Sequence, residues 1–257
     1  MNKSGNDMLR LHGITKVFGG LTALEDVSFS VGRGTITGII GPNGAGKTTL
    51  FNIITGIYRQ TSGEVYLKGK NISGYPSEKL AGFGLVRTFQ SVELFGRMTV
   101  LENVMVGLHT GTKSGILSCA LKLPDQIREE KAIREKGRQW LAFTGMETLA
   151  EVTAENLPFG QCRLLEIARA LALEPELILM DEPAAGLNSR ETTELAGLIK
   201  KIRDMGITVV LVEHDMELVM DICHSVVVLN LGNKLAEGTP RQIQENAAVI
   251  AAYLGEG

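Results

Sequence analysis

The sequence has few cysteines and no long apolar segment. Its 257 residues include three scattered cysteines and no Cys-x-x-Cys pair, which favours reduced cytosolic thiols over a disulfide framework or a zinc site. No window reaches the roughly 18 consecutive apolar residues of a membrane span, and the charged first ten residues lack the apolar core of a signal peptide. We therefore expect any membrane association to come through a partner. The cysteines are Cys119, Cys162 and Cys223.

The chain also lacks an excess of either charge. Its formal net charge is −3, whereas a general nucleic-acid surface needs clustered lysine and arginine side chains. We therefore expect no nucleic-acid partner. The hydrophobic content of 44% and the charged content of 21% are ordinary for a globular protein. The length suits one large α/β domain with a subdomain.

What the chain does have is a glycine-rich stretch, residues 41–49, that fits the pattern Gly, four residues, Gly-Lys-Ser/Thr. Glycines permit positive φ and close approach to an anion, so consecutive N–H groups form a nest that the next helix reinforces. Lys47 can reach the β- and γ-phosphates, and the Thr48 hydroxyl can ligate Mg²⁺. A chance glycine-rich turn is the alternative, but a strand pattern at 35–40 and a helix pattern at 48–57 flank the stretch. The predicted triphosphate site comprises Gly41, Pro42, Asn43, Gly44, Ala45, Gly46, Lys47, Thr48 and Thr49.

The hydrophobic periodicity predicts an α/β fold. Apolar residues at period two, as at Val27, Phe29 and Val31, make residues 1–90 an antiparallel piece beside the first strand of a parallel sheet. Helical spacing then dominates, and the charge-dense run 125–143 is interpreted as a solvated helix face. Short apolar runs from residue 177 onward predict buried strands. We expect one domain over 1–257, with a β-rich and phosphate-loop part (1–90), a helical subdomain (91–160) and the remainder of the α/β core (161–257).

Two predicted strands end in polar residues that suit phosphate chemistry. Residues 177–180 lead into Asp181 and Glu182, and ligands of an open parallel sheet bind beyond the carboxyl ends of its strands. Asp181 suits Mg²⁺ binding through water, and Glu182 suits orienting or deprotonating the attacking water. An ordinary strand end is the alternative, which the upstream phosphate loop disfavours. Residues 209–215 repeat this layout with His214, although a lone histidine there is more often structural.

Three further short motifs stand in the sequence: Gln90 at the end of residues 87–90, Leu157–Gln161 at the start of a long predicted helix, and the loop Ala185–Asn188. With these motifs in order, the chain resembles the ATP-binding subunits of ABC transporters from about Leu9 to its C-terminus. The resemblance implies an α/β, P-loop NTPase core with a mainly parallel sheet and helices on both faces, an N-terminal antiparallel β piece and an inserted helical subdomain. It also implies that Phe18 stacks on adenine, that Gln90 links the nucleotide and Mg²⁺ to the membrane partner, and that His214 senses the γ-phosphate. The matching motifs are the phosphate loop, Gln90 within 87–90, the signature Leu157–Gln161 with nucleotide contacts from Leu157, Gly160 and Gln161, the pair Asp181-Glu182, the dimer-contact loop Ala185–Asn188, and His214.

Four passages are more specifically similar to the ATPase subunits of high-affinity branched-chain amino-acid importers, although amide- or urea-importing relatives share much of this similarity. The passages are residues 161–170, 181–188, 212–220 and 252–256. The signature departs from the general Leu-Ser-Gly-Gly-Gln at Pro158 and Phe159. Proline offers neither a hydroxyl nor an N–H, so this half-site should lose donors. The dimer loop ends in Asn188 rather than Asp, in the style of this group.

The resemblance implies an ATPase that uses ATP and Mg²⁺ to power a membrane importer from the cytoplasmic face of the membrane. Its partners would be a second ABC ATPase subunit, two transmembrane permease subunits and, indirectly, an extracytoplasmic solute-binding protein. The main alternative is a soluble ABC ATPase that acts in protein or cluster assembly without a membrane partner. A simple nucleotide kinase would leave Leu157–Gln161 and His214 without a role, because phosphoryl transfer alone needs neither.

Overall fold

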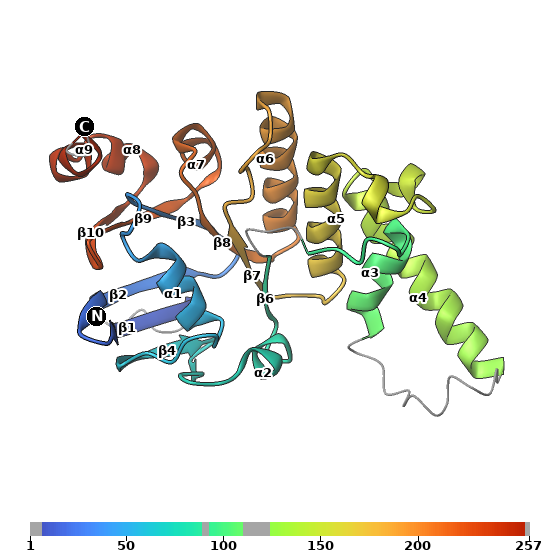
Figure 1. Ribbon diagram of the computed structural model, residues 1–257, viewed down its shortest axis with the longest axis horizontal. Helices are drawn as coiled ribbons and strands as arrows, with labels where there is room; N and C mark the ends of the chain where they lie inside the picture. Colours follow the sequence, from blue (N-terminus) through green and yellow to red (C-terminus); the bar gives the residue numbers. More distant parts are fainter. Residues whose placement is uncertain (1–6, 89–92, 110–123, 255–257) are drawn as a thin grey trace. The chain divides into compact units, whose positions relative to one another are not determined.

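The computed structural model describes residues 7–88, 93–109 and 124–254 (Figure 1). The chain forms two compact units, one made of Met1–Gln90 with Glu176–Gly257 and the other of Ser91–Pro175. The first contains both β-sheets, and the second is helical. The second unit includes the helix that follows Pro158, whereas the sequence interpretation ended the helical subdomain at residue 160. The division into domains stays a prediction.

An antiparallel sheet occupies the start of the first unit, with the strand order β2-β1-β4-β5. Alternate side chains of its two long strands are buried, as the period-two pattern predicts, and these include Leu9, Leu11, Val27 and Val31. The register of β1 against β2 shifts between Leu11 and Ile14, where Gly13 has a positive φ of 62°. The strands are β1 (Asp7–Phe18), β2 (Leu21–Gly32), β4 (Ser62–Leu67) and β5 (Lys70–Asn71).

The second sheet has the strand order β10-β9-β3-β8-β7-β6. It is parallel from β9 to β6, and only β10 runs antiparallel to its neighbour. All residues of β3, β7 and β8 are buried, as expected of strands covered on both faces. The strands are β3 (Ile36–Ile40), β6 (Leu85–Arg87), β7 (Leu177–Asp181), β8 (Thr208–Val212), β9 (Ser225–Asn230) and β10 (Asn233–Gly238).

Helix α1 (Lys47–Ile54) joins the two sheets in one hydrophobic core. Leu50 and Phe51 pack there with alternate residues of the parallel strands and with the inner face of the antiparallel sheet. The sequence pattern extended this helix to residue 57, but it ends at Ile54. Gly56 turns the chain with a φ of 71°, and a Cβ there would lie 2.1 Å from the carbonyl oxygen of Tyr75.

The remaining helices of the first unit are α2 (Ser77–Ala81), α6 (Ser189–Asp204), α7 (Met216–Ile222), α8 (Pro240–Gln244) and α9 (Ala247–Leu254). The predicted caps are confirmed: the side chains of Asn188 and Thr239 each accept from the first turn of α6 or α8, and each forms a capping box. Thr239 does not open the last helix, because α9 follows. Together these elements confirm the predicted α/β class with its antiparallel piece.

In the described part of the second unit, three α-helices pack around a core that includes Val100, Leu141 and Leu165. Its helices are α3 (Val100–His109), α4 (Pro124–Phe143) and α5 (Phe159–Leu171), with 3-10 turns at Glu147–Leu149 and Ala154–Asn156. Gly107 permits close approach of α3 to α5, because a Cβ there would lie 2.6 Å from the carbonyl oxygen of Arg169. Among the described residues, no helix combines the length and apolarity that crossing a membrane requires.

Candidate nucleotide site

The predicted phosphate loop connects β3 to α1, as the flanking patterns indicated. Gly41 and Gly46 have positive φ values of 152° and 100°. A Cβ on Gly41 would lie 2.1 Å from the carbonyl oxygen of Leu229, and one on Gly46 would lie 2.6 Å from Cδ2 of Leu24. Both positions therefore require glycine for space as well as for conformation. The loop packs directly against the strands beside it.

Lys47 starts α1 and is buried within the loop that it follows. Its Nζ donates to the carbonyl oxygens of Gly41 and Pro42 at 2.6 and 2.8 Å. These bonds hold the ammonium group against the loop at the positive end of the helix. Cationic charge, the helix N-terminus and glycine-lined backbone are the features that bind phosphate groups.

A cavity of about 450 Å³ lies over this loop. Glu182 reaches it from the end of β7, so the predicted catalytic carboxylate and the phosphate loop share one cavity. Pro42 is not among the lining residues, and Gly41 lies below the surface. The lining residues are Leu21, Thr22, Ala23, Asn43, Gly44, Ala45, Gly46, Lys47, Thr48, Thr49, Glu182, Leu231 and Gly232.

Asp181 ends β7, directly before Glu182, and is buried in an ion pair. Its Oδ2 accepts from Nη2 of Arg87 at 2.6 Å, and Nη1 of the same arginine donates to Oδ1 of Asn52 at 2.6 Å. Arg87 therefore joins the strand end to α1. Sequence reasoning assigned no role to this arginine, which the motif around Gln90 contains.

Glu182 has a left-handed backbone with a φ of 46°. Its N–H donates to the carbonyl oxygen of Val212 at 2.9 Å, which links the ends of β7 and β8. Its Oε2 lies 3.8 Å from Nδ1 of His214. The two parallel strands thus bring together the predicted catalytic carboxylate and the predicted switch histidine, whose side chain is 65% exposed.

Glu213 is a buried polar residue of this site that sequence reasoning missed. Its carboxylate is fully buried and accepts from the backbone N–H groups of Ala184, His214 and Asp215. Burial raises the pKa of the Glu213 carboxyl, and the three N–H groups and His214 oppose that rise. A charged residue at the end of an apolar strand was the available signal.

Phe18 ends β1 and is 41% exposed. Its ring meets Tyr58 edge-on at 5.4 Å, and the ammonium of Lys16 lies 4.6 Å from the ring centroid. Phe18 does not line the cavity, where the neighbouring residues Leu21 and Ala23 do. Its predicted stacking on adenine stays a prediction. Gln90, predicted to contact the nucleotide and Mg²⁺, lies outside the described residues.

The signature motif opens α5 in the helical unit. Pro158 is the N-cap residue and gives no side-chain cap, while its carbonyl oxygen accepts from the N–H of Cys162. Phe159 is 50% exposed, with the guanidinium of Arg163 5.9 Å from its ring centroid. Arg163 is itself buried and pairs with Glu166 at 2.8 Å. The predicted nucleotide contacts of Leu157, Gly160 and Gln161 stay predictions.

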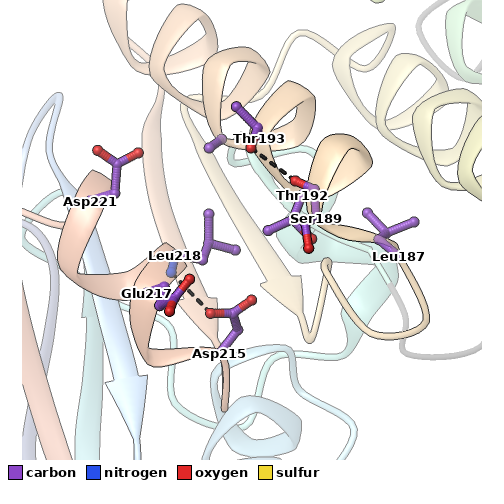
Figure 2. Close-up of a pocket in the computed structure, with 9 residues that line it drawn as sticks. Leu187, Ser189, Thr192, Thr193, Asp215, Glu217, Leu218 and Asp221 are labelled. Carbon is purple, nitrogen blue, oxygen red and sulfur yellow. Dashed lines mark hydrogen bonds between the residues drawn. The ribbon is translucent and has the colours of Figure 1, made fainter.

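A second cavity, of about 340 Å³, lies between α6 and α7 (Figure 2). Leu187, from the predicted dimer-contact loop, lies at one side, and Asp215 caps α7 at the other by accepting from the N–H of Leu218. Exposed Glu217 and Asp221 also line it, and Asp221 pairs with Lys200. Three acidic side chains line this cavity, whereas the buried Lys47 is among the residues that line the one over the phosphate loop.

Comparison with known proteins decides the family. The family model described as ABC transporter matches residues 24–185, and the one described as branched-chain amino acid ATP-binding cassette transporter matches residues 233–257. The chain belongs to the ABC transporter family. It is an ABC transporter ATPase of the branched-chain amino-acid transport group, which confirms the resemblance found in the sequence.

Curated relatives match over nearly the whole chain. The high-affinity branched-chain amino acid transport ATP-binding protein BraF of Pseudomonas aeruginosa is 46% identical, over 97% of this chain and 98% of its own. LivG of Escherichia coli, which carries the same description, is 45% identical with the same coverage. The similarity to these relatives therefore extends over nearly the full length of this ABC ATPase.

Solved structures agree with this assignment. An ADP conformation of an ATP-binding cassette is 34% identical with a TM-score of 0.84, covering 97% of this chain and 99% of that chain. A dimeric cassette in a post-hydrolysis state with ADP and Pi is 28% identical with a TM-score of 0.76, covering 91% of this chain and 99% of that chain. These matches confirm the predicted ABC ATPase fold.

The residues present fit a hard divalent cation beside the phosphates. Thr48, an exposed residue that carries a hydroxyl, lines the cavity, and Asp181 supplies a carboxylate at the end of β7, directly before Glu182. Mg²⁺ prefers such oxygen ligands and usually retains several waters. A water-mediated contact suits Asp181, because one of its oxygens already accepts from Arg87. Within the described part of the chain, no three His, Cys, Asp or Glu side chains gather into a metal cluster.

Proposed function

We propose that this ABC ATPase hydrolyses Mg²⁺-ATP at the cavity over residues 41–49 and thereby powers the import of branched-chain amino acids or of related amides or urea. The observation that carries the catalytic part is the position of Glu182. It shares the cavity with the phosphate loop and lies 3.8 Å from His214. The solute class rests on the match to the branched-chain model and on relatives such as BraF.

Residues of the phosphate loop bind and orient the triphosphate. Backbone N–H groups of the loop hold the phosphate oxygens, and Lys47 adds charge at the start of α1. Thr48, Asp181 and Gln90 hold Mg²⁺, which when bound neutralises phosphate charge and helps to align the reacting groups. Phe18 stacks on the base. The roles of the loop residues rest on the motif resemblance and on the cavity that they line. Those of Phe18, Asp181 and Gln90 rest on the resemblance.

Glu182 acts as the general base on the attacking water. Its carboxylate lies at the cavity wall, with Nδ1 of the His214 imidazole 3.8 Å from Oε2. His214 holds the geometry of the γ-phosphate and the water. Because hydrolysis needs an aligned nucleophile more than covalent chemistry from the protein, positioning by Glu182 and His214 is the main contribution of these side chains.

The working form is a pair of ATPase subunits, in which each phosphate loop faces the other subunit's signature. Leu157, Gly160 and Gln161 of this chain then contact the ATP held by the partner. A solved dimeric relative supports this arrangement. The pair docks on two transmembrane permeases at the cytoplasmic face of the membrane and serves an extracytoplasmic solute-binding protein. Relatives described as transport ATP-binding proteins support these partners.

Substitution of Glu182 by Gln tests the catalytic assignment. The variant should bind ATP with wild-type affinity, since the amide keeps the size of the side chain. Its turnover should fall roughly 100-fold or more, in the range lost with a general base. Turnover near wild type would remove Glu182 from its role.

Co-purification from native detergent extracts tests the partners, and recovery with soluble proteins only would exclude the transporter complex.

A further inference from the structure

We propose that Glu213 is a positioning residue that fixes the segments carrying Glu182 and His214 relative to one another. This inference rests on the proposed roles of those two residues. It gives the buried carboxylate of Glu213 the role of holding their segments in place. Glu213 is 0% exposed and does not line the nucleotide cavity. Its action on hydrolysis must therefore pass through its neighbours.

The hydrogen bonds of Glu213 join two loops. One carboxylate oxygen, Oε1, accepts from the N–H of Ala184 at 2.8 Å, in the segment that follows Glu182. The other, Oε2, accepts from the N–H groups of His214 at 3.0 Å and Asp215 at 3.2 Å. The β7–β8 ladder ends at the pairing of Asp181 with Val212. Glu213 continues the connection beyond the ladder, where the catalytic side chains lie.

The backbone of Glu182 has a conformation that needs support from surrounding contacts. Its φ of 46° is a left-handed conformation that residues with a Cβ disfavour. Such a conformation persists where surrounding contacts determine the chain path, and it is common at active sites. The Glu182 N–H bond to Val212 fixes one side of the residue, and the Ala184 N–H bond to Glu213 fixes the other. Loss of the second bond removes one of the contacts that hold the segment carrying Glu182 in this conformation.

The site requires a carboxylate. Three backbone N–H donors converge on Glu213, and an ionised carboxylate is a pure acceptor with two oxygens. A glutamine of the same size has one acceptor oxygen and directs an NH₂ donor at the remaining N–H groups. It therefore cannot satisfy both loops at once. An aspartate keeps the charge but is one methylene shorter.

The Glu213→Gln variant of the full chain tests the proposal, with steady-state ATP hydrolysis as the assay. We expect kcat to fall roughly 10- to 100-fold, as for a small displacement of catalytic groups. We expect KM and the affinity for a non-hydrolysable ATP analogue to stay within about twofold, because the phosphate loop is untouched. The matched control is Glu217→Gln, which removes the same charge from an exposed position four residues later. It should behave as wild type.

Two results would overturn the proposal. One is a Glu213→Gln variant with the kcat of the Glu217→Gln control. The other is rapid hydrogen exchange of the Ala184, His214 and Asp215 amides in the wild-type chain, where the Glu213 bonds predict slow exchange. If the Glu213→Gln variant does not fold, the hydrogen-exchange measurement on the wild-type chain tests the proposal instead. That measurement is also independent of the proposed function, because its result does not change if Glu182→Gln retains turnover.

Discussion

Arg87 and Asp181 form a buried ion pair, with Nη2 of Arg87 2.6 Å from Oδ2 of Asp181. The residues are 94 positions apart in the chain, and both side chains are almost fully buried. The same guanidinium donates to Asn52 on α1 and lies 5.6 Å from the ring of Phe51. One arginine therefore connects the helix after the phosphate loop, the strand before Gln90 and the proposed Mg²⁺ ligand.

Removal of this arginine should destabilise the first unit. In Arg87→Met the carboxylate of Asp181 stays buried without its cation, and breaking such a pair typically costs about 3–5 kcal/mol. Urea unfolding followed by far-UV circular dichroism measures the change in the free energy of unfolding. The control is Arg33→Met, because Arg33 lies in a half-exposed contact with Glu176 at 3.9 Å. It should cost less than about 1 kcal/mol, and equal losses in the two variants would contradict the prediction.

Local chemistry explains which parts of the site the sequence revealed. The phosphate loop and the pair Asp181-Glu182 lie within short segments whose residue types and flanking patterns favour phosphate binding over a chance turn or an ordinary strand end. Arg87 and Glu213 act through contacts between β6, β7 and β8, which a residue pattern does not encode. Arginine in a strand and glutamate before a histidine are usually surface residues. Their roles depend on which strands become neighbours.

The elements of the fold also separate into those that local sequence patterns predict and those that depend on distant contacts. Buried strands such as β7 are continuous apolar runs, and Asn188 is followed at the right spacing by Glu191, so both were predictable. The edge strand β10 was not predicted because none of its residues is buried and it has no alternation of apolar and polar side chains, and its pairing with β9 is set by the neighbouring strand. Similarly, α1 was predicted too long because the pattern did not include the packing of Gly56 against Tyr75.

Two glycines of the phosphate loop should respond differently to alanine. In Gly41→Ala the new Cβ would lie 2.1 Å from the carbonyl oxygen of Leu229, so the loop must move and ATP binding should be lost. Gly44 has a φ of 77°, but no atom lies within 4 Å of the added Cβ. Gly44→Ala should lower the free energy of unfolding only by the cost of placing alanine in a left-handed conformation, about 1–2 kcal/mol.

Thermal unfolding and ATP-binding titrations of both variants check this contrast. Gly69→Ala is the control for the backbone cost alone, because Gly69 has the same φ of 77° and open space, but lies in the turn between β4 and β5. It should match Gly44→Ala in stability and bind ATP as wild type does. Normal ATP binding by Gly41→Ala would refute the packing argument for the loop.

The thiol of Cys223 should be unreactive in the folded chain. Burial, with a smaller contribution from the charge of Glu213, raises the pKa of Cys223 from 9.0 to about 12. At pH 8 only about one thiol in ten thousand is then ionised, and the thiolate is the reactive form. Iodoacetamide at pH 8 should therefore label Cys223 slowly in native protein and rapidly in urea, as measured by peptide mass spectrometry.

The same shift has a consequence for stability. The folded chain keeps this proton above the pH at which the unfolded chain releases it. The contribution of Cys223 is therefore fully present below about pH 9 and is lost as the pH rises toward 12. Native labelling as fast as labelling in urea would show that the thiol is accessible, and would exclude both expectations.

In the helical unit, Arg163 and Glu166 on α5 form another buried ion pair, at 2.8 Å. Arg163→Met should destabilise this unit by about 3–5 kcal/mol, because it removes the guanidinium that pairs with the buried carboxylate of Glu166. The double variant Arg163→Met/Glu166→Leu should recover most of the loss, since apolar side chains of similar size often replace a buried pair without cost. The single variant thus measures the loss of the Arg163 cation beside a buried carboxylate, and the double variant measures the loss of the whole pair.

Trp140 allows this unit to be followed by itself. It is the chain's one tryptophan and lies in α4, so its fluorescence during urea unfolding reports on the helical unit. Arg134→Met is the matched control, because Arg134 makes an exposed contact with Glu151 at 3.7 Å, and it should cost less than about 1 kcal/mol. A double variant no more stable than Arg163→Met would mean that the guanidinium stabilises α5 through other contacts, such as the ring of Phe159 in the signature. In that event the aromatic residue that departs from the general signature would depend on Arg163 for its position.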